Sequence, residues 1–174
     1  LAYFLLFSSN FQVSAINVSG NSSIVSQEIE KIALENIKQR LFGAGVFSVY
    51  SGSIFTASSK KIAQEISGRH AVVENALVEK KLPNKINIVV KERTPSAVFC
   101  GVEDLNDCFL IDKKGVVFER LNNIPSGRII LRGRPKEVSE GHNAVNEKTM
   151  GIIDSVAKNL RDNFQMDIKE VFIS

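Results

Sequence analysis

The sequence contains no tryptophan and only two cysteines and two histidines among its 174 residues. Metal sites need clustered ligands such as C-x2-C pairs, and no such pair is present. A phosphate-binding loop is also missing, because the glycines of residues 43–45 follow an expected helix instead of joining a strand to a helix. The sequence therefore predicts neither a metal site nor a cofactor.

An excess of charge of one sign is missing as well. The net charge is only +3, and no basic surface interleaved with aromatic residues is visible, so nucleic acid is not an expected partner. His70 follows a glycine that should end a helix, and His142 lies in a loop, so neither has an evident catalytic partner. Asp104, Asp107 and Asp112 lack the spacing of an EF-hand loop and are interpreted as solvated turn residues. These observations favour a protein that is not an enzyme and has no small-molecule substrate.

Residues 1–7 are all apolar or aromatic, and the first charged residue is Glu28. A membrane-spanning helix needs about 20 apolar residues, so seven cannot cross a bilayer. We interpret residues 1–10 as the end of a truncated transmembrane anchor. The core of a signal peptide and a buried N-terminal strand are the alternatives.

Residues 72–97 hold the clearest structural pattern. Two runs of strand-forming residues flank Leu82-Pro83-Asn84-Lys85, which is a turn sequence. The second run alternates, with Ile86, Ile88 and Val90 on one face. The first run is more charged near the turn, as edge strands are. We expect a β-hairpin whose second strand is central and whose first strand lies at the sheet edge.

A strand and two helices are predicted before this hairpin. Residues 11–18 alternate as a strand. A helix capped by Ser26 carries an apolar stripe as far as Leu41, and a shorter helix begins at Ser58 or Ser59 and ends at Gly68. Two helices can cover one face of a three-stranded sheet, which predicts an α+β unit over residues 11–95.

After Pro95 the pattern changes to short strands, at 97–100, 108–112, 116–120 and 128–131. Residues 112–115 suit a type I turn with Gly115 in the left-handed conformation. A helix is predicted over residues 146–164 and a last strand over 168–173. Residues 96–174 are therefore expected to form a second, mixed β-domain with one helix.

The ordered motifs resemble the bacterial cell-division protein family FtsQ, also called DivIB. The family pattern has a strand ending in V-x-G-N, a serine-capped helix, a hairpin with P-N in its turn, then E-R-x-P-x-A and I-D-x-x-G-x-x-F. The matching residues here are Val18, Gly20, Asn21, Pro83, Asn84, Glu92, Arg93, Pro95, Ala97, Ile111, Asp112, Gly115 and Phe118. The resemblance covers residues 1–120 well and continues more weakly to Ser174.

The resemblance implies a single-pass protein of the bacterial cytoplasmic membrane, with a POTRA domain and a β-domain on its extracytoplasmic side at the division septum. Its role would be to link early and late division proteins and to bind FtsB and FtsL. A POTRA module of an outer-membrane or secretion transporter is the alternative, although that class usually shows several POTRA repeats. An enzyme is the third class, for which no set of catalytic residues was found.

Two sets of residues are candidates for a structural or binding role. Cys100 and Cys108 flank a predicted hairpin connection, and an oxidising extracytoplasmic location would permit a disulfide between them. In the family, hairpin positions that correspond to Asn75, Val78 and Lys80 are associated with recruitment. Val78 and Lys80 share a face while Asn75 lies opposite, so strand pairing through the backbone explains the three positions better than one patch of side chains.

The resemblance also implies docking strands after the strand at 168–173. We therefore expect this chain to be a fragment of a longer protein, with a β-domain that is incomplete at its C-terminus. On that expectation residues 11–174 alone do not bind FtsB. The alternative is a minimal β-domain that docks its partner through residues 168–173.

Overall fold

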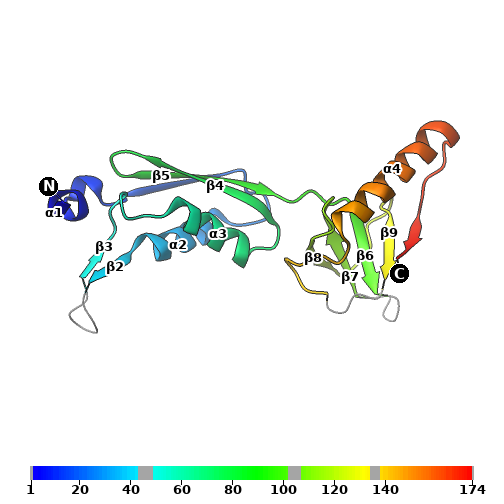
Figure 1. Ribbon diagram of the computed structural model, residues 1–174, viewed down its shortest axis with the longest axis horizontal. Helices are drawn as coiled ribbons and strands as arrows, with labels where there is room; N and C mark the ends of the chain where they lie inside the picture. Colours follow the sequence, from blue (N-terminus) through cyan, green and yellow to red (C-terminus); the bar gives the residue numbers. More distant parts are fainter. Residues whose placement is uncertain (1, 43–48, 102–106, 134–137, 174) are drawn as a thin grey trace. The chain divides into compact units, whose positions relative to one another are not determined.

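The computed structural model describes residues 2–42, 49–101, 107–133 and 138–173. The chain forms two compact units, Leu1–Glu92 and Arg93–Ser174, and Figure 1 shows both. Each unit combines a β-sheet with helices. The predicted α+β fold class is therefore confirmed.

The first unit is built on a three-stranded sheet with the order β1-β5-β4. Strand β1 (Ala15–Ser19) runs parallel to β5 (Lys85–Glu92), and β4 (Val73–Lys81) pairs antiparallel on the other side of β5. The expectation that the second strand of the hairpin is central and the first lies at an edge is confirmed. Ile86, Ile88 and Val90 are buried, as their alternation predicted.

Helices α2 (Ser26–Ile37) and α3 (Ser59–Arg69) lie on one face of this sheet (Figure 1). Their buried apolar residues and the inward residues of β4 and β5 form one continuous core. Ser58 caps α3, since its hydroxyl accepts a hydrogen bond from the Lys61 backbone N–H at 3.3 Å. The helix continues one residue beyond Gly68, to Arg69.

Two details of the first unit differ from the sequence predictions, and a third is not tested. Ser26 is the first residue of α2 and not its cap, because the capping position belongs to Val25. Leu41 lies in β2 (Gln39–Phe42), which pairs antiparallel with β3 (Val49–Ser51), so its assignment to the helix was wrong. Gly43 and Gly45, expected to break the helix, lie outside the described residues.

The first strand begins later than predicted. Residues Ala2–Phe7 form α1 and Ser9–Phe11 form a 3-10 turn, η1. The backbone of residues 11–13 then bonds to residues 52–54: Ile54 N–H donates to the Phe11 carbonyl at 2.9 Å, and Val13 N–H donates to the Gly52 carbonyl at 3.0 Å. These bonds take the place of sheet pairing, so β1 starts at Ala15.

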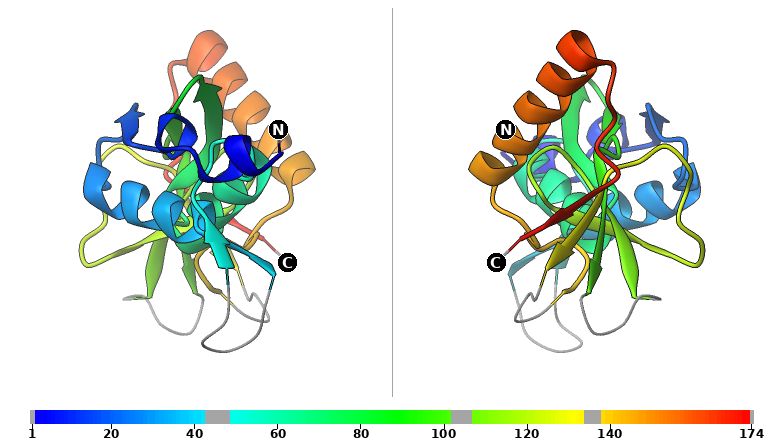
Figure 2. Two further views of the ribbon diagram at one scale, coloured as in Figure 1. Left: turned by 90° about the vertical axis from the view of Figure 1, so that its left-hand side faces the viewer. Right: turned by 90° about the vertical axis from the view of Figure 1, so that its right-hand side faces the viewer.

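The second unit contains a five-stranded sheet with the order β10-β9-β6-β7-β8. Its strands are β6 (Ala97–Gly101), β7 (Cys108–Ile111), β8 (Val117–Leu121), β9 (Ile130–Gly133) and β10 (Glu170–Phe172). Helix α4 (Glu147–Phe164) begins after its cap Asn146 and lies beside this sheet (Figure 2). Its residues Met150 and Ile153 share one hydrophobic core with residues of the strands. The predicted helix and short strands are thus confirmed to within about two residues.

One buried carboxylate, that of Asp112, organises the turn between β7 and β8, so the interpretation of Asp112 as a solvated turn residue was wrong. Asp112 Oδ1 accepts hydrogen bonds from the backbone N–H groups of Lys114 and Val116 at 2.8 and 3.0 Å. Its other oxygen, Oδ2, accepts a hydrogen bond from Arg93 Nη1 at 2.5 Å. Gly115 has a φ of +78°, as the predicted turn requires, and its carbonyl accepts the Ala144 N–H at 3.0 Å. The turn therefore holds both Arg93 and the segment that leads into α4.

Gly115 and Gly127 allow a matched test of this turn. Both have nearly the same φ, +78° and +79°, but a Cβ at position 115 would lie 2.0 Å from the Val145 carbonyl oxygen, whereas position 127 faces open space. Gly127→Ala should cost about 1 kcal/mol of backbone strain. Gly115→Ala should cost about 3 kcal/mol or more, because the clash adds to the strain. Urea unfolding of the two variants checks this expectation, and equal losses of stability would contradict it.

Candidate protein-binding surfaces

Strand β4 is an edge of the first sheet and carries the three predicted binding residues. Among the residues that the structure describes, it pairs only with β5. Asn75 and Lys80 have exposed side chains, whereas Val78 is buried in the core. The three side chains therefore form no single patch.

The backbone of β4 can be oriented from the bonds of its neighbour. In β5 and the turn before it, the carbonyls of Asn84 and Val90 point toward β1. Ser14 N–H donates to the Asn84 carbonyl at 2.9 Å, and a Cβ on Gly20, which follows β1, would lie 2.2 Å from the Val90 oxygen. The N–H and C=O groups of successive residues point to opposite sides of a strand. The even residues of β5 therefore hydrogen-bond to β1, and its odd residues hydrogen-bond to β4.

The register then decides which residues of β4 face outward. Leu77 pairs with Val89 and Glu79 with Asn87, so the odd residues of β4 bond to β5. The even residues direct their N–H and C=O groups away from the sheet. Val78 and Lys80 therefore offer backbone groups to a further strand, while Asn75 can contribute only its side chain.

Strand β10 forms an edge of the second sheet. Lys169 C=O accepts the Ile130 N–H at 2.9 Å, and Ile173 N–H donates to the Arg132 carbonyl at 2.7 Å, so the odd residues here bond to β9. The backbone groups of Glu170 and Phe172 point outward by the same alternation. The Phe172 ring is 72% exposed.

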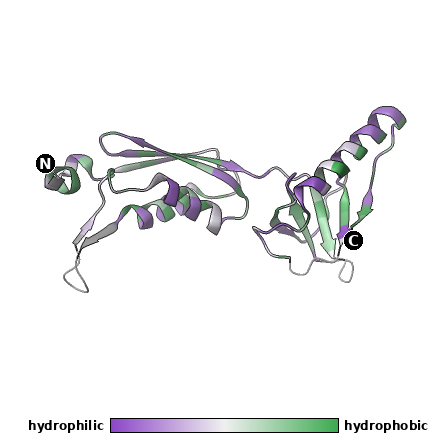
Figure 3. Ribbon diagram, in the orientation of Figure 1, coloured by the Kyte–Doolittle hydropathy of each residue, from purple (hydrophilic) through white to green (hydrophobic). Residues whose placement is uncertain are grey.

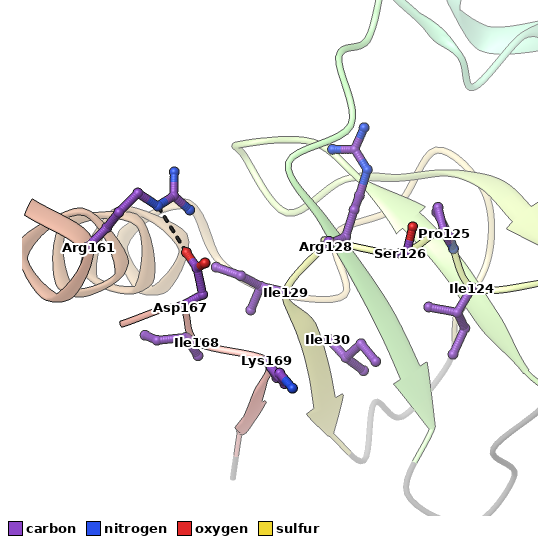
Figure 4. A pocket seen from close by; sticks show the side chains of 11 residues that line it. Ile124, Pro125, Ser126, Arg128, Ile129, Ile130, Arg161, Asp167, Ile168 and Lys169 are labelled. Atoms are coloured by element: carbon purple, nitrogen blue, oxygen red, sulfur yellow. Dashed lines mark hydrogen bonds and ion pairs between the residues drawn. The ribbon is translucent and has the colours of Figure 1, made fainter. Parts of the chain in front are cut away.

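A groove of about 540 Å³ lies just before β10 (Figure 4). Its apolar lining includes Ile124, Ile129, Ile130 and Ile168, and its charged lining consists of Arg128, Arg161, Lys169 and Asp167. Arg161 Nε donates to Asp167 Oδ1 at 3.0 Å, so two cations remain unbalanced within the lining. Sequence analysis missed this groove, because its residues come from separate segments that share no periodicity.

The neighbouring residues Glu92 and Arg93 of the family motif each hold a turn of their own unit. The Glu92 carboxylate accepts the Ser22 and Ser23 backbone N–H groups at 2.7 and 2.8 Å and the Ser23 hydroxyl at 2.9 Å. Burial raises the pKa of Glu92, but these hydrogen bonds together outweigh burial and hold it below its ordinary value. The ionised carboxylate thus fixes the turn after β1, while Arg93 fixes the turn at Asp112.

The other polar residues considered from the sequence are dispersed. His70 is the C-cap residue that follows α3, and His142 Nδ1 lies 3.0 Å from Ser139 Oγ in an exposed turn. Asp107 pairs with Arg120 at 3.0 Å, and Asp104 lies outside the described residues. No cluster of three metal-ligating side chains occurs in the described parts of the chain.

Cys100 and Cys108 pair directly across β6 and β7 and form a disulfide with a Cα–Cα distance of 4.2 Å. Both are buried. The bridge closes a connection of only a few residues between adjacent strands of the second sheet.

We expect no free thiol in protein purified from an oxidising compartment. Thiol titration after denaturation without a reductant measures this directly. Replacing both cysteines by alanine should lower the free energy of unfolding by roughly 2 to 3 kcal/mol, because the open chain gains conformational entropy. Two titratable thiols per chain in the purified protein would contradict the expectation.

Hydrogen bonds to the last carbonyls of α1 were not predicted. Ser53 Oγ donates to the Leu5 carbonyl, and Ser51 Oγ and Gln12 Nε2 donate to the Leu6 carbonyl, each at 2.8 Å. No periodic pattern marks the two serines, because their contacts join positions more than forty apart in the chain. None of the helices in the described ranges is both long and apolar enough to span a bilayer.

A three-stranded β1-β5-β4 sheet with two helices on one face is the architecture of a POTRA domain. Residues 11–93 match the family described as POTRA domain, FtsQ-type. The chain belongs to the FtsQ/DivIB family.

Curated relatives share a single description. The cell division protein DivIB of Clostridium botulinum strain Hall is 27% identical over 157 residues, which cover 88% of this chain and 55% of the relative. DivIB of Clostridium acetobutylicum is 33% identical over 120 residues, which cover 69% of this chain and 41% of the relative. This chain thus spans about half the length of the curated relatives it matches.

Proposed function

We propose that this protein is a non-enzymatic scaffold of bacterial cell division. The FtsQ-type POTRA domain and relatives described as cell division protein DivIB support this role. Its partners would be division proteins, including FtsB and FtsL. An N-terminal anchor would hold it in the cytoplasmic membrane at the septum, with both units on the extracytoplasmic side.

The open edge of β4 carries the proposal for recruitment. A partner strand could extend the sheet beyond β4 by bonding to the outward backbone groups of Val78 and Lys80. Backbone pairing would supply affinity, and the exposed side chains of Asn75 and Lys80 would supply selectivity. The buried Val78 would act through its backbone alone.

Lys80→Pro tests this mode of binding. Proline removes the outward N–H of residue 80 but no bond to β5, and proline is tolerated on edge strands. A fluorescent fusion carrying Lys80→Pro should fail to reach mid-cell, while the circular dichroism spectrum of the purified variant stays nearly unchanged.

Lys80→Ala is the matched control, because it removes the side chain and keeps the N–H. We expect its recruitment to remain close to that of the parent protein. Normal mid-cell recruitment of the Lys80→Pro protein would rule out strand addition at β4. Equal loss in both variants would assign recruitment to the lysine side chain instead.

We propose that FtsB docks on the β10 side of the second sheet. In the family the docking strands follow the strand that matches β10, so titration of residues 11–174 with an FtsB peptide should show no micromolar binding. Binding by the parent chain that Phe172→Pro abolishes and Phe172→Ala preserves would instead identify β10 as the docking strand. The pair of variants separates the outward N–H from the exposed ring.

A further inference from the structure

Helix α4 has apolar residues on its solvent side as well as on its core side. Met150, Ile153 and Ala157 are buried, as expected of a helix that covers a sheet. Ile152 and Val156 lie on a different face and are 56% and 47% exposed. Figure 3 shows hydrophobic and hydrophilic residues along α4. Two aliphatic side chains one turn apart therefore remain in water, where the fold of the second unit does not need them.

Two small residues lie beside this exposed pair. Gly151 is in the interior of α4, where glycine is less favourable than alanine. A Cβ at position 151 would meet nothing within 4 Å, so packing within the described parts of the chain does not require glycine there. Ser155 Oγ donates to the Gly151 carbonyl at 2.7 Å, so this hydroxyl can leave water without losing its hydrogen bond. The backbone of another helix could therefore approach α4 closely at this place.

Opposite charges stand at equal distances from Ser155. Lys148 lies seven residues before it and Asp162 seven residues after it, and both are exposed. Seven residues are nearly two helical turns, so the three residues follow one line along α4. Within the described ranges neither Lys148 nor Asp162 takes part in an ion pair. The line has a cation at one end, a neutral centre and an anion at the other end.

Such a line is complementary to its own reverse. In a pair of copies related by a two-fold axis, every contact between two different residues occurs twice. Two antiparallel α4 helices that cross at Ser155 would set Lys148 of each copy opposite Asp162 of the other. Helices that cross at about 20° stay in contact over several turns, which would also cover Ile152. A parallel pair would instead bring like charges together.

We propose that this face of α4 binds a second copy of the chain, with the two helices antiparallel and the two-fold axis at Ser155. The inference goes beyond the proposed role in division and does not depend on it. A single pair of helices buries less area than a standard interface, so the association is weak and concentration-dependent. Pairing would give the protein two copies of each binding edge.

Cross-linking tests the position of the axis in the full 174-residue chain. Cys100 and Cys108 are joined, so Ser155→Cys adds the only free thiol. Two such thiols at the crossing point would lie within reach of a disulfide, and mild oxidation should give a covalent dimer on a non-reducing gel. Asp154→Cys is the matched control, because residue 154 is also exposed but points about 100° away around the helix. We expect it to cross-link several-fold less.

Charge reversal tests the antiparallel register by sedimentation velocity across a concentration series. Lys148→Asp and Asp162→Lys should each weaken self-association by about tenfold, because two attractive pairs become repulsive. The first variant is then acidic at both ends of the line and the second is basic at both ends. An equimolar mixture of the two should therefore form mixed dimers at least as tightly as the parent chain associates with itself.

A parent chain that stays monomeric and gives no cross-link through Ser155→Cys would overturn the inference and leave the role in division untouched. Equal cross-linking through positions 154 and 155 would also overturn it, since the contact would then be unspecific. Association that survives both charge reversals, or that the mixture of variants does not restore, would assign self-association to another surface and overturn the antiparallel arrangement.

Discussion

The shared central strand β5 is the constraint on which the first unit depends. Its side chains alternate between the helix-covered core and the open face, while its backbone groups alternate between β1 and β4. Once Ile86 and Ile88 are buried, the register of both neighbours is settled, because a slip of one residue would expose the whole apolar set. The outward direction of the backbone N–H and C=O groups of Val78 and Lys80 in β4 follows from this register.

Much of this fold could be predicted from local patterns. The alternation of β5, the stripe of α4 and the glycine turn at Gly115 each arise from neighbouring residues, and all three were located correctly. Predictions failed where long-range contacts decide the structure. Leu41 follows Ile37 at helical spacing, yet pairing between β2 and β3 takes it into a strand. Phe11 fits an alternating strand, yet its carbonyl bonds to Ile54.

The same contrast between local patterns and long-range contacts holds for the candidate surfaces. The edge position of β4 could be read from its charged residues, because edges carry a local signature. The groove near β10 could not, since it combines segments that only the fold brings together. Nothing in the sequence around Ser51 and Ser53 marks them as hydrogen-bond donors to the carbonyls of Leu6 and Leu5.

The adjacency of Glu92 and Arg93 has a practical consequence for dissecting this protein. The boundary between the two units falls at the peptide bond between these residues, and each side chain locks a turn on its own side. A first unit that ends one residue before Glu92 lacks the carboxylate that closes the turn at Ser22. A second unit that begins one residue after Arg93 lacks the guanidinium that pairs with Asp112. Separate expression of the two units therefore requires a boundary between Glu92 and Arg93. Truncations that pass this boundary in either direction will lower the stability of one unit, and that loss can be mistaken for a loss of binding.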